Sequence, residues 1–454
     1  MPETGPSGPR PLRVLIVGGG FAGIGCARRL AGHDGVHVTL VDRNNYHQFQ
    51  PLLYQVATSQ ITPSHIAYSL RKLFRKKENV DVKMSEVAEV DPATRSVLTV
   101  HGRRYEGDVL VLAAGSRPNF FGTSGAAEHA FPLYSLDDAL QVRSRIIGVF
   151  EDADRDPGLV ERGALTFVVV GGGPTGVEMA GALADLVEET MRVEYHDLPV
   201  EAARVHLVDV GHELLAPFAG KAHDYAARVL TRKGVELHLG TAVKEVGPGH
   251  VTLSDGTRIA TRCTIWGGGI MAADPARADA LPHGHGGRVE VEPDLTVAGH
   301  DGVYAIGDVA NIPGPGGRAF PQLGSVAMQS GVWAADNIIA TAAGKPRQAF
   351  RYRDKGIMAM IGRGAALAEV GPKHRELRGL PAFGAWLGVH AVLMTGVRNR
   401  IEAFTDWGAA YFTSARGPQV IDRAAARRID WDDDVVPDVA TAEKAPAEGA
   451  QTPA

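Results

Sequence analysis

Two stretches of this sequence share one pattern: a β-branched apolar run, a glycine cluster and a run of small residues. The first is LRVLIVGGGFAGIGCARR over residues 12–29, and the second is LTFVVVGGGPTGVEMAGALAD over residues 165–185. In both, the glycines have the spacing G-x-G-x-x-G and are Gly18, Gly20, Gly23 and Gly171, Gly173, Gly176. A strand that turns through such a loop into a helix binds the pyrophosphate of a dinucleotide.

The three glycines of each copy have separate steric roles. The first permits a tight turn, the second lets the pyrophosphate approach the backbone, and the third lets the helix pack closely on the strand. One copy would be weak evidence, but two copies in register with strand and helix patterns are specific. The sequence therefore predicts an α/β protein with two Rossmann-like domains that bind two dinucleotides.

An acidic residue follows the next strand in each copy. Asp42 ends the run VHVTLV, at the usual spacing from Gly23, where a carboxylate can accept hydrogen bonds from the adenosine ribose. Asp209 ends the corresponding strand of the second copy but lies farther from Gly176, and we expect residues 187–200 to fill the difference as an extended helix and a turn. The carboxylate of Asp209 would repel a 2′-phosphate, and no arginine follows immediately to offset this repulsion. The second site is therefore predicted to prefer NADH to NADPH.

Composition limits the remaining possibilities. The 454 residues contain two cysteines, Cys26 and Cys263, which form no C-x-x-C pair and so fit a reducing compartment without a redox-active disulfide. The N-terminal residues lack the apolar core of a secretory signal. Neither a basic face for nucleic acid nor a trustworthy metal-ligand spacing is evident, so we expect neither partner. From Asp430 onward seven carboxylates oppose Lys444, and residues 431–454 are predicted to be a disordered acidic tail.

Several further segments resemble the type II NADH dehydrogenases, which are single-chain flavoprotein NADH:quinone oxidoreductases. They are RNNYHQFQPLLYQVAT (43–58), DVLVLAAG (108–115) and GVYAIGDVAN (302–311), and the resemblance covers most of residues 13–421. It implies FAD in the first domain and NADH in the second. Within it, Ala114 and Gly115 correspond to the family's A-T-G element beside the cofactor. Gly307 and Asp308 correspond to its second FAD signature, in which the carboxylate accepts a ribityl hydroxyl.

The same resemblance suggests residues at the quinone end of the reaction. Residues 322–339, QLGSVAMQSGVWAADNII, are similar to a segment with the family pattern A-Q-x-A-x-Q, in which Gln329 matches the second glutamine and Ser325 replaces the first. Glu178 lies two residues beyond Gly176 on the first turn of the second helix. A carboxylate is favourable at a helix N-terminus, but the resemblance implies that Glu178 handles quinone or protons. We therefore expect Glu178 and Gln329 to be catalytic.

The segment GLPAFGAWLGVHAVLMTGV, residues 379–397, raises the question of a membrane-spanning helix. Glycines and Pro381 interrupt it, and aromatic and basic residues flank it, so an amphipathic anchor at the membrane surface is favoured. A dimer interface or a buried core helix remains the alternative. The residues assigned to the anchor are Trp386, Phe404, Trp407, Tyr411, Arg398, Arg400 and Arg416. The resemblance (VRNRIEAFTDW) agrees with a peripheral protein on the cytoplasmic face of the cell membrane.

These observations predict a discontinuous FAD-binding domain (1–160 and 271–345), an NADH-binding domain (161–270) inserted into it, and a small C-terminal α+β domain (346–430). The expected reaction is hydride transfer from NADH to FAD, then transfer of two electrons to a membrane quinone without proton pumping. Alternatives are a soluble NAD(P)H oxidoreductase with oxygen or ferredoxin as acceptor, and a non-catalytic nucleotide-sensing flavoprotein. Sulfide:quinone and disulfide reductases need cysteines that the chain lacks. Neither the quinone nor a possible homodimer follows from the sequence.

Overall fold

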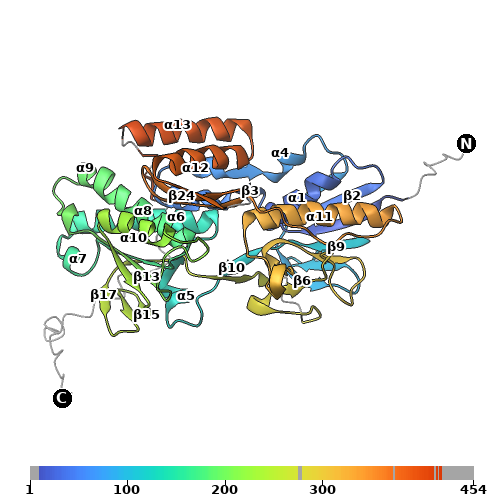
Figure 1. Ribbon diagram of the computed structural model, residues 1–454, viewed down its shortest axis with the longest axis horizontal. Helices are drawn as coiled ribbons and strands as arrows, with labels where there is room; N and C mark the ends of the chain where they lie inside the picture. Colours follow the sequence, from blue (N-terminus) through green and yellow to red (C-terminus); the bar gives the residue numbers. More distant parts are fainter. Residues whose placement is uncertain (1–9, 275–278, 372–373, 414–415, 418, 422–454) are drawn as a thin grey trace, which may run out of the picture.

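Two five-stranded parallel sheets form the core of the protein, in the two lobes of Figure 1. The computed structural model describes residues 10–274, 279–371, 374–413, 416–417 and 419–421. The first sheet has the order β21 (Val303–Ala305), β9 (Val109–Leu112), β1 (Leu12–Val17), β2 (Val36–Asp42), β5 (Val80–Met84). The second has the order β11 (Ala130–Pro132), β18 (Cys263–Trp266), β12 (Thr166–Val170), β13 (Arg204–Asp209), β14 (Val235–Leu239). In both, the strand that enters a glycine loop, β1 or β12, lies at the centre.

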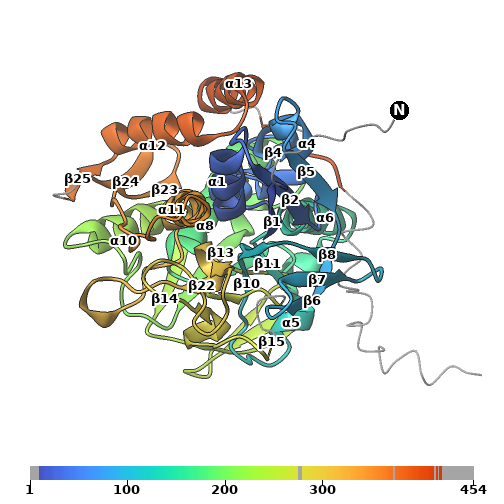
Figure 2. The same cartoon turned by 90° about the vertical axis from the view of Figure 1, so that its right-hand side faces the viewer.

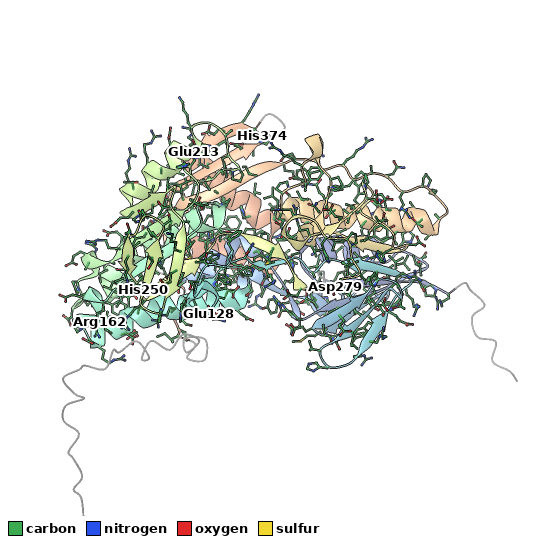
Figure 3. All side chains as sticks on the ribbon, turned by 90° about the horizontal axis from the view of Figure 1, so that it is seen from below. Glu128, Arg162, Glu213, His250, Asp279 and His374 are labelled. Atoms are coloured by element: carbon green, nitrogen blue, oxygen red, sulfur yellow. The ribbon has the colours of Figure 1, made fainter. Side chains whose placement is uncertain are left out.

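The duplication extends beyond the glycine loops. In each lobe a three-stranded antiparallel sheet comes in the chain directly before β9 or β18, the strand that pairs with the one entering the glycine loop. These sheets are β6 (Val87–Asp91), β7 (Ser96–Thr99), β8 (Arg104–Glu106) and β15 (Val243–Gly247), β16 (His250–Leu253), β17 (Arg258–Ala260). Figure 3 shows the lobes from below, with His250 and Arg162 on the second lobe and Asp279 toward the first. The predicted pair of Rossmann-like domains is therefore confirmed.

One strand of the second sheet lies before the expected domain boundary. In the second sheet, the edge strand β11 comes before the glycine loop in the chain, and α6 (Leu136–Arg155) follows β11. In the first sheet, the edge strand β21 comes after the inserted lobe. The chain passes between lobes at β10 (Ser116–Pro118) and β19 (Ile270–Ala272), which pair antiparallel. The second sheet thus begins at Ala130, before the boundary predicted at residues 160 and 161.

Close helix packing holds the first lobe together. Helices α1 (Phe21–Leu30) and α11 (Gly324–Ala342) approach so closely that a Cβ on Gly331 would lie 2.1 Å from the carbonyl oxygen of Ala22. In the second lobe, a capping box formed by Ser135 and Asp138 begins α6. Beyond α8 (Pro174–Leu186), residues 187–194 continue as a π-turn and a short helix, as expected for the long gap before Asp209.

The C-terminal part is a small α+β unit. Strands β23 (Gly356–Gly362), β24 (Ala365–Val370) and β25 (Arg375–Arg378) form an antiparallel sheet. Helices α12 (Leu380–Leu393) and α13 (Val397–Thr413) follow and lie along one side of the molecule, as Figures 1 and 2 show. No helix in the described ranges is both long and apolar enough to span a bilayer. The predicted tail, residues 431–454, lies outside the described residues.

Two of the aromatic residues assigned to a surface anchor are instead interior. Trp386 is fully buried and Trp407 is 8% exposed. Arg416 is also turned inward, because its guanidinium donates to Thr190 Oγ1 and to the carbonyl oxygen of Thr58. The part of the prediction that placed these side chains at a surface is wrong. Other apolar residues of α12 and α13 are exposed: Leu380, Val389, Val392, Leu393, Val397, Ile401, Phe404 and Phe412.

Candidate functional site

The first glycine loop is closed by a carboxylate. Gly18 has φ +106°, and a Cβ there would lie 2.3 Å from the carbonyl oxygen of Ala113, so no side chain fits. Asp42 Oδ2 accepts the N–H of Gly19 at 2.6 Å, and its Oδ1 accepts the N–H of Asn44 at 2.6 Å. Burial raises the pKa of Asp42, which these two hydrogen bonds oppose. A carboxylate has lone pairs for further donors, so a ribose hydroxyl can still bind there.

The second glycine loop repeats this geometry. Gly171 has φ +115°, and a Cβ there would lie 2.8 Å from the backbone of Gly267. Asp209 Oδ2 accepts the N–H of Gly172 at 2.6 Å, while Oδ1 accepts the N–H of Gly211 at 2.6 Å. The longer insertion before Asp209 therefore leaves the carboxylate in the same position relative to its loop.

Both loops fit the pyrophosphate of a dinucleotide. The middle glycines, Gly20 and Gly173, directly precede the helices α1 and α8, and a Cβ on either would meet no atom within 4 Å. The space is thus open where a helix N-terminus presents its free N–H groups, which suits an anion. Beside the second loop, Thr175, Tyr134, Trp266 and Ile270 line part of an open hollow.

A hydroxyl chain links the expected FAD residues across the sheet edge. Ser116 Oγ donates to Asp308 Oδ2 at 3.1 Å and lies 2.6 Å from the hydroxyl of Tyr134. Burial raises the pKa of Asp308, and Ser116 opposes this effect. Gly115 precedes Ser116 directly and has φ +74°. The sequence alone does not predict a role for Ser116 or Tyr134, because single hydroxyl residues outside a motif give no signal.

Glu178 is a buried carboxyl on α8. Its Oε1 accepts the backbone N–H of Met360 on β23 at 3.1 Å. Burial raises the pKa of Glu178 to about 8, against the opposing effects of Met360 and the indole of Trp386. The Trp386 indole nitrogen does not reach hydrogen-bond geometry with any partner in the described part of the chain. Glu178 is therefore protonated at neutral pH and close to its titration point.

A buried polar and aromatic cluster surrounds Glu178 and reaches the C-terminal helices. Trp386 on α12 stacks on His390, with ring centroids 3.9 Å apart, and meets Tyr54 edge-on at 6.4 Å. Gln55 donates to the Tyr54 hydroxyl at 3.0 Å and accepts the indole N–H of Trp407 on α13 at 2.8 Å. The segment after Asp42 thus contacts both helices.

Gln329 lies apart from this cluster. Its Nε2 donates to the carbonyl oxygen of Arg353 at 3.0 Å, and its Oε1 accepts the N–H of Arg353 at 2.9 Å. The neighbouring Ser325 hydroxyl lies 2.8 Å from the Tyr352 hydroxyl. Both polar atoms of the Gln329 amide are therefore engaged with backbone, and contact with a substrate would require this pair to break.

The two cysteines take no part in the site. Cys26 on α1 and Cys263 on β18 are free and fully buried. Burial raises the pKa of each thiol to about 12. Neither is available as a thiolate nucleophile at neutral pH.

Comparison with known proteins gives consistent results. The family described as pyridine nucleotide-disulphide oxidoreductase matches residues 12–331. The type II NADH:quinone oxidoreductase Ndh of Mycobacterium tuberculosis is 38% identical over 431 residues, 91% of each chain. The type II NADH:quinone oxidoreductase of Haemophilus influenzae is 29% identical over 79% of this chain and 86% of its own.

Solved structures with the same fold include proteins of different chemistry. NDH2 from Plasmodium falciparum in complex with NADH has a TM-score of 0.83 at 18% identity, covering 90% of this chain and all of that one. The sulfide:quinone oxidoreductase from Aquifex aeolicus has a TM-score of 0.68 at 19% identity, covering 89% of this chain and 96% of its own. At these identities the likeness concerns the fold alone.

The raised pKa of Glu178 predicts a pH-dependent stability. Its pKa in the folded protein, about 8, exceeds the ordinary value of 4.5, so this carboxyl contributes fully to the stability of the fold below pH 4.5. The contribution is lost as the pH rises toward 8, by up to about 1.4 kcal/mol per pH unit. Between pH 5 and pH 7.5 the free energy of unfolding, measured with urea, should fall less in Glu178→Gln than in the parent. Equal losses in both proteins would contradict the assigned pKa.

Proposed function

The chain belongs to the pyridine nucleotide-disulphide oxidoreductase family and to the type II NADH:quinone oxidoreductases within it, and from this premise we propose that it oxidises NADH and reduces a quinone through bound FAD. NADH gives up a hydride, and the quinone gains two electrons and two protons. The observation that carries the proposal is the pair of matched dinucleotide loops together with a protonated carboxyl, Glu178, buried beneath α12.

FAD, when bound, supplies the redox chemistry, whereas the protein supplies binding, orientation and electrostatics. The first loop, with Asp42 and Asp308, holds FAD in this proposal, and the second loop, with Asp209, holds NADH. Gly172 and Gly211 fix Asp209 through their N–H groups, so the carboxylate is already oriented toward the ribose position. The oriented charge favours two ribose hydroxyls over a 2′-phosphate.

Glu178 delivers or receives a proton at the acceptor side. A general acid is most effective when its pKa lies near the operating pH, and burial brings the pKa of Glu178 to about 8. Trp386 on α12 lies beside this carboxyl and stacks on His390. Gln329 acts in this proposal as a positioning residue, because it holds α11 to the segment before β23 through Arg353.

We further propose that α12 and α13 rest on a membrane that carries the quinone. Their exposed side chains include Val392 at 68%, Val397 at 71%, Ile401 at 61% and Phe412 at 83%. Exposed apolar side chains gathered on two neighbouring helices support an interaction surface, and lipid fits it because α12 has no charged side chain. Two buried, unpaired thiols suit the reducing side of the cell membrane, its cytoplasmic face.

Separate measurement of the two half-reactions tests the function. We expect anaerobic NADH to bleach the bound flavin, and a menaquinone or ubiquinone analogue to restore its colour. In Glu178→Gln the NADH step should be preserved, and the quinone step should slow by about 100-fold, because a general acid contributes that much. The exposed Glu188→Gln is the control and should behave like the parent.

Three results would count against this account. Failure to take up FAD, or a bleached flavin that no quinone reoxidises, would reject the proposed function. An unchanged quinone step in Glu178→Gln would reject only the role of the carboxyl.

Nucleotide selectivity tests Asp209. We expect kcat/KM for NADH to exceed that for NADPH by at least about tenfold, since about 1.4 kcal/mol of charge repulsion is a factor of ten. Asp209→Asn keeps an oxygen acceptor for Gly172 but removes the charge, so the ratio should fall. The matched variant Asp42→Asn in the first loop should weaken FAD retention and leave the ratio unchanged. Equal kcat/KM values for both nucleotides in the parent would contradict the prediction.

Vesicle sedimentation tests the membrane surface. Each exposed apolar side chain that enters lipid contributes up to about 1.5–3 kcal/mol, so Val392→Glu with Phe404→Glu should leave the protein in the supernatant. The parent should sediment with vesicles of anionic and neutral phospholipid. Val193→Glu, an equally exposed site in the second lobe, is the control and should sediment too.

The same variants identify a different use of this surface. Suppose that the parent does not bind vesicles and forms a dimer, and that the double variant Val392→Glu with Phe404→Glu is a monomer. The surface is then a dimer interface, and the membrane proposal is wrong.

A further inference from the structure

Three potential metal ligands meet on one face of the second parallel sheet. His206 on β13 lies opposite Glu236 on β14, and His238 follows Glu236 by two residues. Because side chains alternate along a strand, Glu236 and His238 point to the same face. Figure 2 shows β13 and β14 in this lobe. One ligand atom from each of the three side chains lies within 4.8 Å of the others.

The separations suit a tetrahedral cation. His206 Nδ1 lies 3.1 Å from His238 Nε2 and 3.4 Å from Glu236 Oε2. Metal–nitrogen and metal–oxygen bonds of about 2.0–2.2 Å in a tetrahedron place neighbouring ligand atoms roughly 3.3–3.6 Å apart. Two imidazoles and a carboxylate are ligands that zinc and its neighbours in the first transition row accept.

The surroundings leave these atoms free for a cation. Arg204 approaches Glu236 through the other carboxylate oxygen, Oε1, at 3.9 Å, which leaves Oε2 for the site. Asp255, in the turn between β16 and β17, adds negative charge near His238. The His206 side chain is 11% exposed and that of Glu236 is 51% exposed, so an ion can enter from solvent and keep a water ligand.

We propose that His206, Glu236 and His238 bind one divalent transition cation of the zinc class, with water as the fourth ligand. The site is independent of the proposed quinone chemistry. A bound ion joins the edge strand β14 to β13 at His206, three residues before Asp209. The ion therefore stiffens the end of β13 that carries the Asp209 carboxylate. Sequence spacing did not indicate the site, because the ligands come from two strands that are well separated in the chain.

Zinc titration of the FAD-loaded, chelator-treated protein tests the proposal. We expect calorimetry to record one bound Zn²⁺ per chain and a higher thermal unfolding temperature with Zn²⁺. Co²⁺ should give a ligand-field band at longer wavelength than the oxidised flavin, with the intensity of a tetrahedral site. His238→Asn and Glu236→Gln should each weaken Zn²⁺ binding by at least about tenfold, because even outer partners of a metal site contribute that much.

The matched control is His37→Asn in the first lobe. His37 on β2 lies 3.7 Å from Asp81 on β5, which gives a histidine and a carboxylate on neighbouring parallel strands without a second histidine. This variant should bind Zn²⁺ like the parent. Absence of Zn²⁺ binding by the parent would overturn the proposal and leave a direct hydrogen bond between His206 and His238. Undiminished binding in both His238→Asn and Glu236→Gln would overturn it as well, since the ion would then lie elsewhere.

Discussion

Each glycine-loop helix can lie against its own strand only because no side chain stands between them. A Cβ on Gly23 would lie 1.8 Å from the carbonyl oxygen of Gly18, and one on Gly176 would lie 1.7 Å from that of Gly171. This contact fixes the direction in which α1 and α8 leave their strands and opens the space before their N-termini. It also determines the burial of Glu178, because a residue two positions after Gly176 is carried into the interior where α8 meets β23. The raised pKa of Glu178 is therefore a consequence of the same steric constraint that builds the nucleotide loop.

The sequence was sufficient for features that depend on local patterns. Glycine spacing and apolar runs predicted both loops, their strands and the acids Asp42 and Asp209. These features are local, because each acid binds backbone N–H groups within its own Rossmann unit. It was insufficient for β11, a very short strand whose place in the second sheet depends on pairing with β18, which comes much later in the chain. The antiparallel pairing of β10 with β19 is equally non-local. Such pairings are decided by tertiary packing, which a short apolar segment does not encode by itself.

Side-chain partners explain the other differences between expectation and structure. Tryptophan is common at membrane interfaces because its ring is apolar and its N–H needs a polar partner. In this fold Gln55 supplies that partner to Trp407 from inside the protein, so the ring is buried. The same reasoning applies to Gln329, whose position in a family pattern suggested substrate contact. The backbone of Arg353 satisfies its amide, and this partner is not visible in the pattern itself.

The fold alone does not determine which donor reduces the flavin, since sulfide:quinone oxidoreductase from Aquifex aeolicus shares it with a TM-score of 0.68. Chemistry that forms sulfur–sulfur bonds needs a reactive thiolate, and thiolates form where the surroundings lower the pKa of a cysteine. Here burial raises the pKa of both thiols to about 12. The titratable group that burial brings near neutrality is instead the carboxyl of Glu178, which can donate a proton but cannot form a sulfur bond. The residues around the shared fold therefore disfavour sulfide as the donor, and the carboxyl of Glu178 suits an acceptor that takes up protons with its electrons, as a quinone does.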